Sequence, residues 1–159
     1  MKNYIWVLIL LIVAGGIYFY SKDKKVVNVE ENPITTVCYY EEVGNEIKDV
    51  FSLKLVMQNE KVTGELKFLP AEKDKKVGPL EGLVAPFGEN NSSRVIAAWW
   101  DASAEGTTVR EQSSIILESD KAQIGFGEMK EIEDGSYIFV DPLTLSYSLS
   151  LSKTDCSKI

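Results

Sequence analysis

The sequence predicts an all-β domain, an antiparallel meander closed into a barrel, behind one N-terminal transmembrane helix. Three observations support this: one charge-free apolar run near the N-terminus, period-two alternation over much of the remaining chain, and two cysteines at the margins of the alternating region. We therefore expect a cytoplasmic tip at 1–3, a transmembrane anchor at 4–21, a linker at 22–33 and one β domain at 34–159.

The apolar run extends from Tyr4 to Tyr20 and contains no charged residue. As a helix it would span about 26 Å, slightly less than the ~30 Å hydrocarbon core of a bilayer. Aromatic residues at both of its ends match the interfacial belts of membrane helices. The alternative is a cleaved signal peptide with its cleavage site at Ala14-Gly15-Gly16. An uncleaved anchor is favoured because apolar residues resume after the glycines.

Two features of the chain predict opposite orientations of the anchor. Lysines at 22, 24 and 25 outnumber Lys2, which by the positive-inside rule favours a cytoplasmic C-terminal domain. The two cysteines, Cys38 and Cys156, favour the opposite, because disulfides persist in oxidising compartments. We expect a Cys38–Cys156 disulfide and a domain outside the cytoplasm, with cleavage and secretion as the alternative.

Alternation of apolar and polar residues predicts the strands. It is clearest over 51–57 and 62–68, which form a hairpin around Gln58-Asn59-Glu60, and over 145–152. Further strands are expected at Thr35–Glu42, Val77–Ala85, Arg94–Asp101, Thr107–Glu118, Ala122–Met129 and Ser136–Val140. Eight to nine strands could form a barrel or a two-sheet sandwich. The barrel is favoured because closure removes edges, and because glycines at 64, 78, 82, 125 and 127 suit bent strands.

Composition excludes several kinds of chemistry. The chain has no histidine, which rules out imidazole-based hydrolysis and most zinc, copper and haem sites. Of 17 Lys and Arg and 24 Asp and Glu residues, four and one respectively lie before Val26, so the rest has a net charge of −10. Such a surface repels phosphate backbones. We expect no cofactor, no metal, no nucleic acid and no enzymatic activity.

The candidate binding residues are Trp99, Trp100, Asp101, Glu105 and Arg110. Adjacent strand residues point to opposite faces, so one Trp should enter the core while the other faces outward. An outward Trp beside charged side chains is typical of a recognition surface. The alternative is that both rings only cover apolar surface at a corner of the barrel.

Several short segments carry a resemblance. They are Cys-Tyr-Tyr at 38–40, Leu-Pro-Ala-Glu-Lys-Asp at 69–74, Trp-Trp at 99–100, Ala-Glu-Gly at 104–106 and Gly-Phe-Gly-Glu-Met at 125–129. With the closing Cys156, this series resembles a group of small bacterial membrane-anchored proteins of no known function. The resemblance implies one N-terminal membrane segment or lipid anchor and brings no catalytic residue. The overall plan is also similar to lipocalin-like and lysozyme-inhibitor-like barrels.

The expected function is that of a non-enzymatic, membrane-tethered binding or envelope-associated module outside the cytoplasm. Its partners would be the membrane, through 4–20, and an envelope protein or glycan. A lipocalin-like carrier of a small apolar ligand is the first alternative and requires an empty barrel. A carboxylate-dependent hydrolase is the second, and requires two of Asp101, Glu105 and Glu111 to face each other across a cleft.

Overall fold

The computed structural model of the chain describes residues 33–88 and 92–159. The expected anchor at 4–21 and nearly all of the expected linker lie outside these residues. In the part that is described, no helix is both long and apolar enough to cross a membrane.

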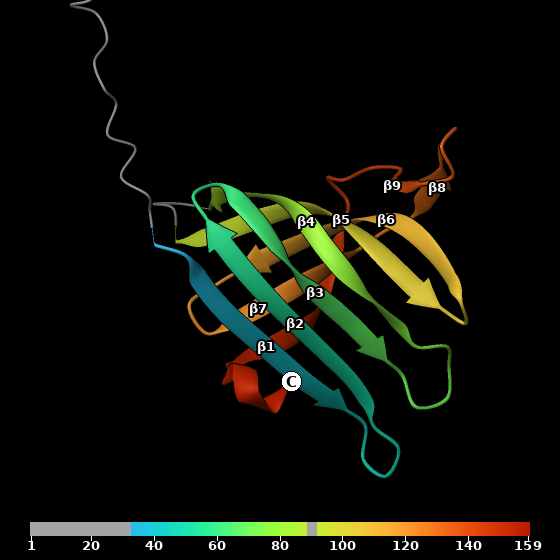
Figure 1. Cartoon of the computed structure of the whole chain (residues 1–159), viewed down its shortest axis with the longest axis horizontal. Helices are drawn as coiled ribbons and strands as arrows, with labels where there is room; N and C mark the ends of the chain where they lie inside the picture. The colour runs from blue at the N-terminus through green and yellow to red at the C-terminus, as the bar shows by residue number, and fades with distance from the viewer. Residues whose placement is uncertain (1–32, 89–91) are drawn as a thin grey trace, which may run out of the picture. The chain divides into compact units, whose positions relative to one another are not determined.

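The described chain forms ten strands and one short 3-10 helix, shown in Figure 1. The strands are β1 (Thr35–Val43), β2 (Asp49–Gln58), β3 (Lys61–Leu69), β4 (Lys76–Phe87), β5 (Ser93–Ala104), β6 (Thr107–Leu117), β7 (Lys121–Phe126), β8 (Met129–Glu131), β9 (Tyr137–Phe139) and β10 (Ser146–Thr154). The helix η2 (Cys156–Lys158) follows β10.

Eight of the strands close into an antiparallel barrel. Their order is β5-β4-β3-β2-β1-β10-β7-β6, and pairing of β5 with β6 closes the ring. The predicted all-β antiparallel barrel is thus confirmed. The remaining strands, β8 and β9, form a small hairpin beside β6, which β9 joins by one parallel bridge between Glu111 and Tyr137.

Two predicted strands have the wrong bounds. The strand expected at Ala122–Met129 is divided at Gly127, so that β7 ends at Phe126 and β8 begins at Met129; this is the source of the tenth strand. The strand expected at Arg94–Asp101 continues to Ala104 as β5, so the turn before β6 is only Glu105-Gly106. Both turn residues have positive φ, 49° and 81°, which allows the sharp reversal that joins β5 to β6.

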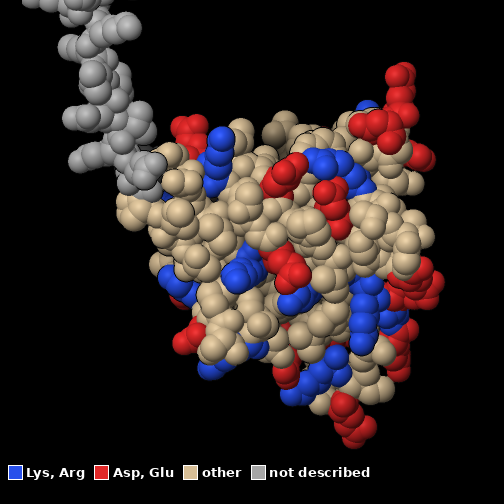
Figure 2. Space-filling view, in the orientation of Figure 1, with Lys and Arg blue, Asp and Glu red and all other residues tan. Residues whose placement is uncertain are grey.

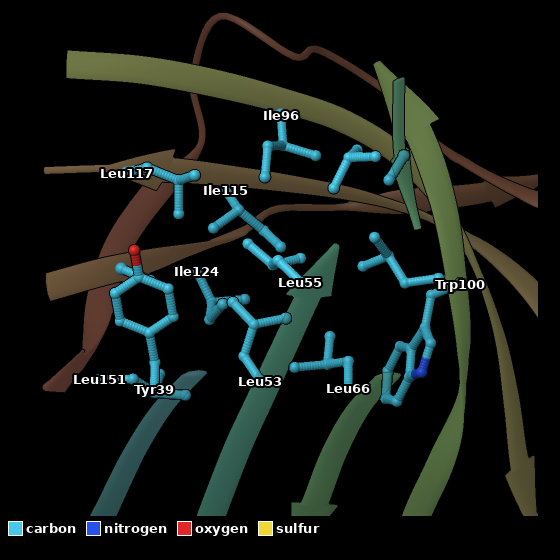
Figure 3. Packing of buried hydrophobic residues seen from close by; sticks show 14 of the residues in the cluster. Tyr39, Leu53, Leu55, Leu66, Ile96, Trp100, Ile115, Leu117, Ile124 and Leu151 are labelled. Carbon is cyan, nitrogen blue, oxygen red and sulfur yellow. The ribbon is translucent and has the colours of Figure 1, made fainter. Parts of the chain in front are cut away.

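The barrel interior is packed with large aliphatic side chains (Figure 3). The residues with the least exposure come from β2, β3, β4, β5, β6 and β10: Leu53, Leu55, Leu66, Leu80, Ile96, Ile115 and Leu151, each at most 1 % exposed. Burying one such side chain contributes about 1.5–3 kcal/mol. They occupy the space that an internal apolar ligand would need, so the interior argues against the carrier alternative.

The last strand departs from its predicted pattern. Alternation over 145–152 predicted one continuous apolar face, but a β-bulge lies between Ser146 and Leu149. One extra residue switches the side chains that follow to the other face. Leu149 and Leu151 pack on the core, whereas the Tyr147 hydroxyl lies 2.8 Å from the Ser114 hydroxyl.

Small residues let β4 and β5 approach closely inside the barrel. Gly82 lies directly opposite Ala98, and a Cβ added at Gly82 would lie 2.7 Å from the Cβ of Ala98. Glycine is therefore required there by lack of space, a reason that the sequence, which suggested only bent strands, did not indicate.

We predict that Gly82→Ala lowers the free energy of unfolding by about 1–3 kcal/mol, because overpacking forces the strands apart. Urea unfolding followed by tryptophan fluorescence measures it. Gly106→Ala is the matched control: open space surrounds its Cβ position, and only its φ of 81° resists a side chain. A smaller loss at Gly82 than at Gly106 would contradict the steric explanation.

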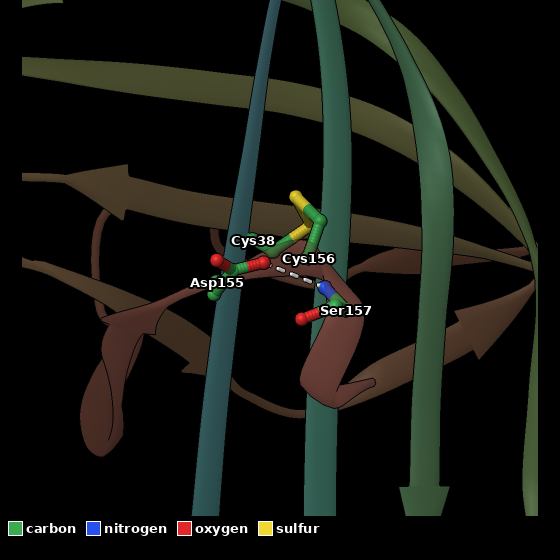
Figure 4. The surroundings of a disulfide bond; sticks show 4 residues. All are labelled: Cys38, Asp155, Cys156 and Ser157. Atoms are coloured by element: carbon green, nitrogen blue, oxygen red, sulfur yellow. Dashed lines mark hydrogen bonds between the residues drawn. A yellow bond between two sulfur atoms is a disulfide. The ribbon is translucent and has the colours of Figure 1, made fainter.

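The predicted disulfide joins Cys38 in β1 to Cys156 at the start of η2 (Figure 4), with 5.1 Å between their Cα atoms. The Cys38 side chain is 1 % exposed, so the bridge covers the outer face of β1 with the end of the chain. Asp155 caps η2, since its carboxylate accepts a hydrogen bond from the Ser157 backbone N–H at 2.9 Å. That hydrogen bond lowers the pKa of Asp155.

Candidate functional site

The two adjacent tryptophans point to opposite sides of β5. Trp100 enters the core and is 4 % exposed; its Nε1–H donates a hydrogen bond to the Gly78 carbonyl oxygen at 3.2 Å. The ring centroid of Phe68 lies 5.1 Å from that of Trp100. Trp99 lies on the outer surface and is half-buried. The predicted division between an inner and an outer Trp is therefore present, with Trp99 as the outer one.

Arg110 fixes the outer Trp99 ring. Its guanidinium carbon lies 5.4 Å from the Trp99 ring centroid, within the range of a cation–π contact. Its Nη1 lies 3.2 Å from one carboxylate oxygen of Asp101, and its Nη2 lies 2.8 Å from Glu81 Oε1. The hydrogen bond to Glu81 raises the pKa of Arg110, so the guanidinium stays charged. Three of the five predicted site residues, Trp99, Asp101 and Arg110, thus form one cluster.

Glu105 does not join this cluster. It lies in the β5–β6 turn and is exposed. The carboxylates proposed for hydrolysis are also separated: Asp101 faces outward to Arg110, whereas Glu111 pairs with Lys76 beside the core residue Trp100. Two acids that point to opposite faces of one sheet cannot share a scissile bond between them.

An apolar surface continues from Trp99 along the outer faces of β4 and β5. The largest exposed side chains are Leu83 (60 % exposed) and Phe87 (47 %), and the strand register places Leu83 opposite Ala97. We call this surface the outer strip; it comprises Leu83, Ala85, Phe87, Val95, Ala97 and Trp99. Sequence reasoning found only its Trp99 end. The remaining residues of the outer strip could have been found from the alternation along β4. There the exposed Leu83, Ala85 and Phe87 alternate with residues on the side of the strand that carries the buried Leu80.

Hollows lie on both sides of the Trp99 ring. One of about 310 Å³ is open and runs over β3 and β4, past Thr63 and Leu83. The other, of about 190 Å³, lies between Gln112 on β6 and the segment after β9, at Pro142 and Leu145. Trp99 therefore forms a ridge between two hollows in the surface.

A second cluster, at one end of the barrel, was missed by sequence reasoning. Phe68 is central: its ring centroid lies 5.4 Å from that of Phe51 and 6.1 Å from that of Phe126. Beside it, Lys76 Nζ lies 2.6 Å from Glu111 Oε1 and 5.9 Å from the Trp100 ring centroid. We call these residues the mouth cluster.

The mouth cluster borders a cavity of about 80 Å³. Its lining comprises Leu66, Phe68, Trp100, Glu111, Gln112, Ser113, Ile124, Gly125, Phe126, Gly127, Met129 and Phe139. The cavity exists because β6 pairs with β7 only over 115–117, and the side chain of Phe139 from β9 partly fills the opening that results. The backbone N–H of Phe139 donates to Gln112 Oε1 at 3.0 Å, which holds it there.

Charge on the visible face of the barrel is mixed. Figure 2 shows acidic and basic side chains interspersed over the face on which β1, β2 and β3 lie in Figure 1. Among residues 33–88 and 92–159, no group of three or more Cys, Asp or Glu side chains could hold a metal ion.

Comparison with models of protein families, with curated proteins and with solved structures finds no match for this chain.

Proposed function

We propose that this protein is a non-enzymatic docking module, tethered to a bacterial membrane by 4–20 with its barrel outside the cytoplasm, and that it binds an envelope protein through the outer strip. The disulfide supports an oxidising compartment. The observation that carries the proposal is the exposed apolar surface that ends at the Trp99 ridge.

Such a surface is unusual for the outside of a filled barrel. The strip faces away from the core, so its apolar side chains contribute little to folding while they remain in water. Leu83, at 60 % exposure, and Phe87, at 47 %, lie on the same face of β4. Contiguous exposed apolar surface with a polar rim marks interaction sites. Here Glu81, Asp101 and Arg110 supply that rim beside Trp99.

A protein partner is favoured over a glycan by the shape of the strip. A glycan site needs polar groups placed along its whole length to meet hydroxyl groups, whereas the charged groups here are gathered at one end. Apolar side chains such as Leu83 and Phe87 instead suit burial against another apolar surface. The ion pairs of Arg110 would then define the register of docking.

Photo-crosslinking from the full chain in its native membrane tests this function. A photoreactive amino acid at Leu83 should give one discrete crosslinked protein, and Trp99→Ala should reduce that product strongly, since truncating an interface Trp weakens binding by roughly thirtyfold or more. The control position is Lys54, which is exposed on β2.

Equal products from positions 83 and 54 would contradict the proposed surface. Crosslinks to lipid alone would show that the strip lies on the bilayer, and retention of the chain by purified envelope glycan that depends on Trp99 would replace the protein partner by a glycan.

A further inference from the structure

The mouth cluster has the chemistry of a cation site. Aromatic faces attract cations through their negative quadrupole, and recognition of alkylammonium groups by aromatic cages is the best-known functional use of that attraction. Trp100, Phe68 and Phe126 line the cavity, and Glu111 lines it as well. We propose that this cavity binds an alkylammonium group, with Glu111 as its counter-ion.

The structure already holds a cation at the edge of this site. Lys76 Nζ lies 2.6 Å from Glu111 Oε1 and 5.9 Å from the Trp100 ring centroid. The Lys76 side chain is 41 % exposed, whereas that of Glu111 is 17 % exposed. The carboxylate is therefore held at the cavity, while the lysine reaches it from the solvent side. The lysine acts as an internal substitute that a ligand cation can replace.

Replacement of Lys76 costs little. The Lys76 side chain is 41 % exposed, so the ion pair contributes weakly, because water solvates the released ammonium. Glu111 would keep a cationic partner throughout, which avoids leaving a partly buried carboxylate unpaired. A ligand in the cavity would also gain contact with the aromatic rings. Lys76 makes this contact only weakly, since its Nζ lies 5.9 Å from the Trp100 ring centroid, at the limit of the usual cation–π range.

The size and position of the cavity fit a compact head group. Its volume of about 80 Å³ exceeds the ~30 Å³ that one water occupies in the liquid but cannot hold an extended molecule. Phe126 is 40 % exposed, so the aromatic wall continues to the solvent and leaves room for a chain attached to the ammonium. Other occupants are less suited: an anion would meet Glu111, and a purely apolar group would leave that charge unused.

Titration of the full chain with choline tests the site. The probe signal is the indole N–H resonance of Trp100, which reports on the ring in the cage, measured in a detergent that carries no ammonium group. We expect saturable shifts with choline, and at least tenfold weaker binding of 3,3-dimethyl-1-butanol, its neutral isostere. Equal binding of the two compounds would refute recognition of charge.

Two substitutions with opposite effects sharpen the test. Lys76→Met should raise the affinity for choline about tenfold, because it removes the competing ammonium. Glu111→Gln should lower it at least tenfold, because it removes the counter-ion. Lys48→Met is the control: Lys48 lies in the β1–β2 connection and pairs with Glu42 near the end of β1, so the substitution changes net charge equally without touching the cavity.

The outcome at Lys76 decides the proposal even if Glu111→Gln fails to fold. An affinity that is unchanged or reduced in Lys76→Met, or raised equally in Lys48→Met, would overturn it. Glycerophosphocholine distinguishes two sources of the group. Binding as tight as that of choline assigns a lipid headgroup, and much weaker binding assigns a free alkylammonium compound. This site is separate from the outer strip, so either proposal can fail alone.

Discussion

Replacing Cys38 and Cys156 together by alanine is expected to lower the free energy of unfolding by about 4–5 kcal/mol. The bridge joins residues 118 positions apart, so it removes a large loop-closure entropy from the unfolded chain. It also fastens η2 over the outer face of β1, where Cys38 is buried. Alanine is preferred to serine, because a hydroxyl at Cys38 would be buried in an apolar place. Guanidinium unfolding followed by tryptophan fluorescence measures the loss.

The control is the wild-type chain with and without reductant. Reduction alone should reproduce most of the loss, since it opens the loop and leaves both side chains in place. Protein taken from the native membrane should also resist alkylation until it is reduced. Free thiols in that protein would contradict both the bridge in the cell and the proposed location outside the cytoplasm.

Trp100→Ala is expected to lower the free energy of unfolding by about 3–5 kcal/mol, as other large-to-small changes in protein cores do. The Trp100 ring is 4 % exposed and packs on Phe68, and its N–H bonds the Gly78 carbonyl oxygen. Truncation would leave a cavity at the mouth of the barrel and remove the hydrogen bond to the Gly78 carbonyl oxygen. Trp100→Phe should cost less, because it keeps part of the aromatic packing.

Trp99→Ala is the matched control one residue away. Trp99 is half-buried on the outer face, so we expect a loss of about 1 kcal/mol, which is common for single substitutions. Urea unfolding of the three variants gives the comparison. Equal losses for Trp99→Ala and Trp100→Ala would mean that the outer ring is part of the scaffold, and would remove the main support for the outer strip as a docking surface.

The sequence alone determined those features that depend on neighbouring residues. Alternation over 51–57 and 62–68 predicted a hairpin, and the structure pairs Phe51 with Phe68 and Leu53 with Leu66 around a turn at Asn59 and Glu60. Strand geometry also determined that adjacent tryptophans would divide between two faces. The rarity of cysteine determined the disulfide, because only one pairing was available.

Only the tertiary structure decided which of the two tryptophans faces the core and which side chains meet at the two candidate sites. The Lys76–Glu111 pair joins residues 35 positions apart, and the outer strip depends on the register of β4 against β5. The bulge in β10 lies inside a run of perfect alternation, so no local pattern marks it. Closure of the barrel brings β1 beside β10 and β10 beside β7. The mouth cavity is lined from β3, β5, β6, β7, β8 and β9, so it forms only when these strands come together in the closed barrel. Local conformational preferences act between residues that are close in the sequence. A binding site, in contrast, is formed by side chains from different strands, and their proximity follows from how the whole sheet closes.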